Sequence, residues 1–124
     1  MANEKILVVD DDKNICELLR LYLVKEGYNV TMVHDGAAAL AEFDKLHPDL
    51  VLLDVMMPVM DGYTATRTIR RLDRPDAGRI PILATTANAF AEDRRRAYEA
   101  GMNEHLTKPL ETELVIKTLA KYRK

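Results

Sequence analysis

The sequence predicts one α/β domain in which five short strands alternate with five helices. Three runs of aliphatic residues contain no polar alternation, as expected for strands buried on both faces of a parallel sheet. Stretches with helical spacing of apolar residues separate the runs, and the alternation occurs five times. The 124 residues suit one domain of this size. We therefore expect a (βα)5 architecture with helices on both faces of the sheet.

Apolar spacing along the first half of the chain predicts three strands and two helices. The expected strands are short and rich in branched aliphatic residues, and they span 6–9, 29–33 and 50–53. The second of them is the least hydrophobic, which suits an edge of the sheet. Apolar residues with helical spacing between Ile15 and Leu23 predict one helix, and Gly27 is its expected end. An alanine-rich helix begins at Gly36 and ends before His47.

The second half continues the same alternation. Asp61 can cap a helix whose apolar residues recur at Ala65 and Ile69. Two further strands are expected at 80–86 and 104–107, and two further helices at 88–100 and 110–122. Gly101 is the expected end of the first of these two helices.

The composition is that of a globular protein of a reducing compartment. With 48% hydrophobic and 31% charged residues, the chain is expected to fold around an aliphatic core. Its net charge of −2 gives no general attraction to nucleic acid or to an anionic membrane, so we expect no direct nucleic-acid binding and no membrane association. The single cysteine, Cys16, cannot form an internal disulfide, and residues 1–5 lack the order of a signal peptide. No apolar run is long enough to span a membrane, so we expect a cytoplasmic protein.

Polar residues collect where the predicted strands end. Asp10 and Asp11 follow the first strand, Asp54 the third, Thr86 ends the fourth, and Lys108 follows the fifth. Because ligands of open parallel sheets bind beyond the carboxyl ends of the strands, these side chains are expected to form one site. Asp10 and Asp11 alone could simply favour a helix N-terminus, and Lys108 alone could be a surface lysine. Their joint placement indicates a site.

Three carboxylates at one edge repel one another and need positive charge between them. Lys108 supplies one charge, and a hard divalent cation such as Mg²⁺ is a natural second. The lysine and the cation would leave room for a phosphate, whose transfer requires neutralised and aligned oxygens. An acid directly after the buried run 50–53 is costly without a role, and a carboxylate nucleophile can form an aspartyl-phosphate.

Four segments in order resemble the response regulator receiver family, and the resemblance covers essentially the whole chain. They are ILVVDD at 6–11, LDVMMPVMDG at 53–62, TANAF at 86–90 and LTKP at 106–109. The resemblance implies a single receiver domain over 1–124 with the flavodoxin-like fold, a parallel sheet in the order 2-1-3-4-5. It also implies two-component signalling by a Mg²⁺-dependent phosphoacceptor. Such a protein assists its own phosphorylation and dephosphorylation and is not an enzyme acting on a separate substrate.

The same resemblance implies roles for the residues of the site. Asp54 would be the phosphorylated aspartate. Asp11, with help from Asp10, would hold Mg²⁺ together with Asp54 and the backbone carbonyl of Met56. Lys108 would pair with an oxygen of the phosphoryl group.

Further residues are implied in the switch. Pro109 would follow a cis peptide bond. Thr86 would donate its hydroxyl to a second phosphoryl oxygen, while Thr85 points to the opposite face because strand residues alternate. In the family an aromatic residue then turns inward behind the threonine. Here that position is His105, a departure, and we expect its inward packing to accompany phosphorylation; the alternative is a partly exposed histidine at a strand end.

Two positions resemble those that tune the lifetime of the phosphoryl group. They are Met56 and Asn88, two residues after Asp54 and Thr86. An apolar Met56 offers no hydrogen bond to orient an attacking water, which predicts slow self-dephosphorylation.

The implied partner is a histidine kinase or a histidine phosphotransfer protein, docked near residues 13–15 and the loop after the last strand. Phosphorylation is expected to change the surface formed by 88–100, 104–107 and 110–122. Segment 86–90 is closer to receivers of hybrid kinases and relay proteins than to those of transcription factors. Because the sequence ends soon after the last helix, we expect no DNA-binding or catalytic domain. The chain would then be a stand-alone regulator, a phosphorelay intermediate or an excised hybrid-kinase receiver, monomeric or weakly dimeric on phosphorylation.

Two other classes could share this architecture. An aspartyl-nucleophile phosphatase of the haloacid-dehalogenase type has a second aspartate two residues after the nucleophile, where this chain has Met56. A nucleotide-binding or flavin-binding module would have a phosphate loop rich in glycine, serine or threonine after the first strand, where this chain has aspartates at 10–12. The residues present therefore disfavour both classes.

Overall fold

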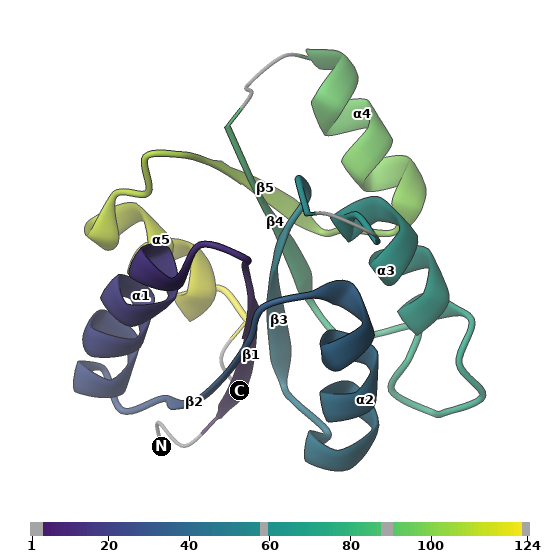
Figure 1. Ribbon diagram of the computed structural model, residues 1–124, viewed down its shortest axis with the longest axis horizontal. Coiled ribbons are helices and arrows are strands. Elements are labelled where there is room, and N and C mark those ends of the chain that lie inside the picture. Colours follow the sequence, from purple (N-terminus) through teal and green to yellow (C-terminus); the bar gives the residue numbers. More distant parts are fainter. Residues whose placement is uncertain (1–3, 58–59, 88–90, 123–124) are drawn as a thin grey trace.

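Five parallel strands alternate with five helices in the computed structural model, which describes residues 4–57, 60–87 and 91–122 (Figure 1). The elements follow one another as β1 (Lys5–Val9), α1 (Lys13–Lys25), β2 (Asn29–Val33), α2 (Gly36–Leu46), β3 (Leu50–Asp54), α3 (Gly62–Arg70), β4 (Ile82–Thr86), α4 (Ala91–Ala100), β5 (Glu104–Thr107) and α5 (Thr112–Ala120). The strands form one sheet in the order β2-β1-β3-β4-β5. This confirms the expected flavodoxin-like fold and places β2 at an edge.

The sheet is buried on both faces, which explains the aliphatic runs. In β1, Ile6 and Val8 pack into a cluster with the buried residues of α1 and α5, while Leu7 and Val9 pack with those of α2, α3 and α4. Figure 1 shows the same division, with α1 and α5 on one side of the sheet and the other three helices on the opposite side. Because successive strand residues point to opposite faces, both sets must be apolar.

Acidic side chains cap three of the helices at their N-termini. Asp12 accepts hydrogen bonds from the amides of residues 14 and 15, Asp35 from the amide of Ala38, and Asp61 from the amide of Thr64. The predicted cap at Asp61 is therefore confirmed. At the other end of α4, Gly101 has a φ of 109°, a conformation that suits glycine, and ends the helix as expected.

Two elements begin two residues later than predicted. β4 begins at Ile82 and not at Ile80, because Pro81 has no amide hydrogen and the Ile80 amide closes a turn onto the Asp76 carbonyl. α5 begins at Thr112, because Glu111 has the extended backbone of a cap residue. The predicted start of α4 at Asn88 lies outside the described residues. Across the described part of the chain, no helix has both the length and the apolar character needed to cross a bilayer.

Arg70 joins three segments beside α4. Its guanidinium donates to the carbonyls of Gly101, Ala77 and Ile80 and to the side chain of Asn103. Burial lowers the pKa of this group, and the four acceptors supply the hydrogen bonds that a half-buried cation requires. The end of α4 is thereby held against the loop that leads into β4.

Gly62 gives a direct test of how closely α3 approaches β3. A Cβ atom at Gly62 would lie 2.5 Å from the Asp54 carbonyl oxygen, whereas a Cβ at Gly78 would meet no atom within 4 Å. We predict that Gly62→Ala lowers the free energy of unfolding by about 1–3 kcal/mol, because α3 must move away from the strand. Gly78→Ala is the matched control and should change it by no more than about 1 kcal/mol. Urea denaturation compares the two, and equal stabilities would contradict this packing.

Candidate functional site

Two buried carboxylates face each other at the carboxyl edge of the sheet. Asp10 directly follows β1 and Asp54 ends β3, and each is 2% exposed. The amide of Asp12 donates to Asp10 Oδ1 over 2.9 Å, and the amide of Met56 donates to Asp54 Oδ1 over 3.2 Å. Each carboxylate is therefore held by the loop that follows its own strand.

Lys108 lies between these two carboxylates. Its Nζ is 3.1 Å from Asp10 Oδ2 and 3.4 Å from Asp54 Oδ1. Its own amide donates to the Thr86 carbonyl over 2.7 Å, which fixes the start of the loop after β5 against the end of β4. The peptide bond between Lys108 and Pro109 is cis, as the family resemblance implies.

The charges of the site do not balance. Burial, and next the nearby charge of Asp10, raise the pKa of Asp54 from 3.8 to about 6, although the Met56 amide and Lys108 act in the opposite direction. Burial lowers the pKa of Lys108, but hydrogen bonds and attraction to Asp10 and Asp54 outweigh it, and the net shift is upward. One lysine therefore does not compensate both carboxylates, and the site favours a further cation.

Asp11 completes an acidic cluster with Asp10 and Asp54. Oxygen atoms of the three carboxylates lie within 4.8 Å of one another, and Asp11 is exposed while the other two are buried. A set of carboxylate oxygens open to water on one side suits Mg²⁺, which retains several waters when bound. The donor set and its excess negative charge thus fit the predicted cation. Coordination by the Met56 carbonyl stays a prediction.

Thr86 and Thr85 lie on different faces of the sheet. Thr85 is in register with Asp54, while Thr86 is in register with Thr107. Because residues alternate along a strand, Thr86 shares the face of Ala84, whose register partner on β5 is His105. The two predicted switch residues therefore lie on the α4 side of the sheet. The approach of the Thr86 hydroxyl to Asp54 stays a prediction.

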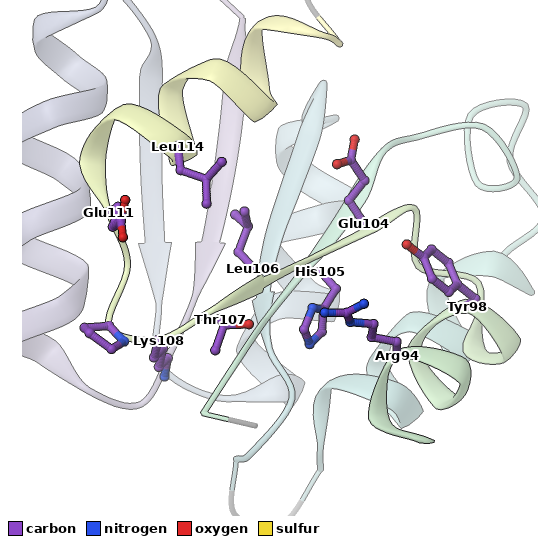
Figure 2. A pocket seen from close by; sticks show the side chains of 10 residues that line it. Arg94, Tyr98, Glu104, His105, Leu106, Thr107, Lys108, Glu111 and Leu114 are labelled. Atoms are coloured by element: carbon purple, nitrogen blue, oxygen red, sulfur yellow. The ribbon is translucent and has the colours of Figure 1, made fainter. Parts of the chain in front are cut away.

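A groove of about 510 Å³ runs along β5 beside these residues. Figure 2 shows His105 next to Arg94 of α4, with Thr107 further along the strand, Lys108 just after its end, and Leu114 of α5 above it. His105 is partly exposed. The groove connects Lys108 of the acidic site with the surface of α4 and α5.

Met56, two residues after Asp54, is an apolar residue that is 66% exposed. It lines a second groove with Tyr63 and Arg96, in which the guanidinium stacks 4.6 Å from the ring centre. The run of arginines at 94–96 is typical of a solvated helix face, so sequence reasoning missed this contact between α4 and α3. The other position expected to tune phosphoryl lifetime, Asn88, lies outside the described residues.

Sequence reasoning also missed two neighbours of Asp10. His34 Nδ1 is 3.1 Å from the Asp10 carbonyl oxygen, and the buried Cys16 thiol donates to the same oxygen over 3.4 Å. Burial, followed by the charge of Asp10, raises the pKa of Cys16 to about 11, so its thiol stays protonated. Neither contact has a signal in sequence spacing.

Comparison with known proteins gives a consistent result over nearly the whole chain. Residues 6–120 match the family model of the response regulator receiver domain. The sensor histidine kinase RcsC of Escherichia coli (strain K12) is 42% identical over 117 residues, which are 94% of this chain but 12% of the kinase. The chain therefore spans a small part of that relative.

Two solved structures share the fold. The receiver domain of the sensor histidine kinase PA1611 from Pseudomonas aeruginosa, with a magnesium ion coordinated in its active-site cleft, has a TM-score of 0.87. It is 37% identical, over 98% of both chains. The chemotaxis response regulator CheY4 of Vibrio cholerae has a TM-score of 0.91 at 31% identity, covering 98% of this chain and 100% of that chain.

The raised pKa of Asp54 predicts a stability that depends on pH. The Asp54 carboxyl binds its proton more tightly in the folded protein than in the unfolded chain. Ionised Asp54 therefore lowers the free energy of unfolding above pH about 6, and this loss of stability disappears as the pH falls towards 3.8. We predict that, in EDTA, Asp54→Asn raises the free energy of unfolding by about 1–3 kcal/mol at about pH 7.5 and by less at about pH 4.5. Urea denaturation at the two pH values measures this. Asp73 is exposed, so Asp73→Asn is the control and should have little effect on the free energy of unfolding. An Asp54→Asn variant no more stable than the wild type at about pH 7.5 would contradict the charge imbalance.

Proposed function

The chain belongs to the response regulator receiver domain family of two-component systems, and from this premise we propose that Asp54 accepts the phosphoryl group. The observation that carries the proposal is the position of Lys108, whose Nζ lies within 3.4 Å of both Asp10 and Asp54 at the carboxyl edge of the sheet. A cation there can neutralise an incoming phosphoryl oxygen without moving away from the acceptor.

The acceptor is suited to attack because of its surroundings. With a pKa of about 6, Asp54 is mainly ionised at neutral pH and is a more basic carboxylate than an exposed aspartate. One oxygen of Asp54 forms a bond to phosphorus while the bond from phosphorus to the donor's histidine nitrogen breaks, and the electron pair returns to the imidazole. The Met56 amide holds one carboxylate oxygen and so fixes the direction of attack.

Asp10, Asp11 and Asp54 would hold the Mg²⁺ that the site favours, together with the Met56 carbonyl. When bound, Mg²⁺ neutralises the oxygens of the phosphoryl group. Lys108, already paired with Asp10, provides the second positive charge. The protein then acts as a phosphoacceptor that assists its own phosphorylation and dephosphorylation and turns over no separate substrate.

The proposed switch involves β4 and β5, the strand that Lys108 directly follows. Thr86 and His105 share the α4 side of the sheet, and the Lys108 amide is bonded to the Thr86 carbonyl. We infer that the Thr86 hydroxyl moves to the phosphoryl group and that His105 packs inward behind it. The groove of α4, β5 and α5 then changes shape, and this surface carries the output.

Receiver domains interact with histidine kinases or histidine phosphotransfer proteins, and we propose that this chain takes its phosphoryl group from one of them in the cytoplasm. Similarity to RcsC and to the PA1611 receiver favours a hybrid kinase or a phosphorelay as the setting, with a stand-alone regulator as the alternative. Residues 1–124 would act as one receiver domain. Docking near Lys13 at the start of α1 would bring the donor beside Asp10 and Asp11.

Incubation with acetyl phosphate tests the proposed chemistry. We expect the wild-type protein to gain one phosphoryl group when Mg²⁺ is present and none in EDTA, because the acidic cluster needs a cation before it admits an anion. Asp54→Asn should gain none, and Asp73→Asn should behave as the wild type. Intact mass spectrometry measures the adduct. Labelling of the Asp54→Asn variant would contradict the assignment, and steady release of phosphate without an adduct would indicate a phosphatase.

Met56 gives a separate prediction about lifetime. Its exposed, apolar side chain cannot orient a water molecule for attack on the phosphoryl group, so Met56→Asn should shorten the lifetime several-fold. Met56→Leu is the matched control and should leave the lifetime within about twofold of the wild type. Loss of the phosphoryl adduct is followed by mass after the phosphodonor is removed. Equal lifetimes for the Asn and Leu variants would show that water access at this position does not limit decay.

A further inference from the structure

The backbone carbonyl of Asp10 is bonded by two side chains that lie outside the acidic cluster. The Cys16 thiol on α1 donates to it over 3.4 Å, and His34 Nδ1, in the loop after β2, lies 3.1 Å from it. Asp10 comes directly after the last register pair of β1 and β2, which is Val9 with Val33. Side chains therefore support the chain at the point where the strand pairing stops.

The distances show which atom donates at His34. A carbonyl oxygen carries no hydrogen, so Nδ1 at 3.1 Å from it must hold the proton of the bond. That proton also prevents Nδ1 from accepting a hydrogen bond from the Cys16 thiol, which is 3.7 Å away, so the thiol donates to the Asp10 carbonyl. Two donors from different elements thus share one carbonyl oxygen, which has two lone pairs to receive them.

These two bonds fix the one part of Asp10 that its other contacts leave free. Its amide donates to the Val33 carbonyl over 3.2 Å, and Lys108 Nζ lies 3.1 Å from its Oδ2 atom. The soft dihedral that remains is ψ of Asp10, which turns the carbonyl and the following chain together. The orientation of the carbonyl therefore decides where Asp11 and the Asp12 amide lie.

We propose that His34 and Cys16 are positioning residues for the Mg²⁺ site, because their bonds to the Asp10 carbonyl hold Asp11 beside the two buried carboxylates. Oxygens of Asp10, Asp11 and Asp54 lie within 4.8 Å of one another in this arrangement. Mg²⁺ requires a nearly ideal arrangement of its oxygen ligands, so a rotation that displaces Asp11 weakens binding. The inference rests on the proposed function, since it requires that the acidic cluster binds Mg²⁺.

Replacement of His34 tests the proposal at an exposed position, where the core is not disturbed. His34→Asn keeps an N–H donor near the place of Nδ1, whereas His34→Leu keeps an apolar side chain and no donor. We expect His34→Leu to raise the Mg²⁺ dissociation constant about three- to tenfold, which is less than for a partner bonded directly to a ligating group. His34→Asn should stay within about twofold of the wild type. Titration with Mg²⁺, followed by proton–nitrogen NMR, measures both constants.

The Asp12 amide reports on the same effect without any metal. It donates to Asp10 Oδ1 over 2.9 Å, so its proton resonance moves upfield when the carboxylate and the loop separate. In EDTA, we expect this resonance to lie further upfield in His34→Leu than in His34→Asn. Both variants lack the imidazole ring, so the loss of its ring current affects the two spectra alike.

Cys16 is buried, so its replacement needs a control for lost stability. Cys16→Ala should weaken Mg²⁺ binding about threefold, and its combination with His34→Leu should weaken binding more than either change alone, because both donors are then lost. Tyr122→Phe is the control, since it removes a hydroxyl that donates to Glu104 over 2.6 Å. Tyr122 lines a groove with residues that precede β3 and β4, at the opposite edge of the sheet. This variant should unfold at lower urea concentration and bind Mg²⁺ as the wild type does.

Equal Mg²⁺ affinities in the wild type and His34→Leu would overturn the inference and leave the proposed function standing. Equal losses in His34→Leu and His34→Asn would also overturn it, because the N–H donor would then not be what matters. A double variant no weaker than His34→Leu would remove Cys16 from the proposal. If the proposed function fails, acetyl phosphate labels Asp54 in no variant. The Asp12 resonance in EDTA still decides the inference in that case, and the same position in both His34 variants would contradict it.

Discussion

The interaction on which the site depends is the pairing of Lys108 with two buried carboxylates. Asp10 directly follows β1 and Asp54 ends the neighbouring strand β3, and the two would repel each other without a cation between them. The lysine only partly compensates, since burial and the charge of Asp10 still raise the pKa of Asp54. The site is thereby prepared for a further cation and, with it, for an anion. The ionised Asp54 on which the proposed function depends therefore also lowers the stability of the fold.

The fold brings these atoms together because its strands are parallel. Parallel strands bring their carboxyl ends to one edge, and the aliphatic runs that bury both faces of β1, β3 and β4 fix which residue comes last on each strand. Asp54 is placed by its strand, while Lys108 is placed by the bond between its amide and the Thr86 carbonyl. The same bond connects the acidic site with the strand pair that carries Thr86 and His105.

The order of elements and the clustering of Asp10, Asp11, Asp54 and Lys108 could be predicted from the sequence, because both follow from residues at the ends of aliphatic runs. Continuous aliphatic runs identify central strands, and an acid at the end of such a run must lie at the sheet edge. Features that depend on distant contacts could not be predicted. Arg70 belongs to a cluster of arginines that is typical of a solvated face, yet it donates to backbone carbonyls up to 31 residues away and to the side chain of Asn103. Leu18 fits the core spacing of α1 but is 44% exposed, since spacing does not show where a buried face ends.

The identity of the phosphoacceptor is the central claim, and reduction with borohydride tests it most directly. Borohydride converts an aspartyl-phosphate to homoserine, so the modified residue can be located by sequencing peptides after treatment with acetyl phosphate and Mg²⁺. Because Asp54 pairs with Lys108 and lies beside Asp10 and Asp11, we predict homoserine at position 54 alone. It should form only in samples that received both acetyl phosphate and Mg²⁺ before borohydride. Homoserine at Asp10 or Asp11, or its absence at position 54, would contradict the account.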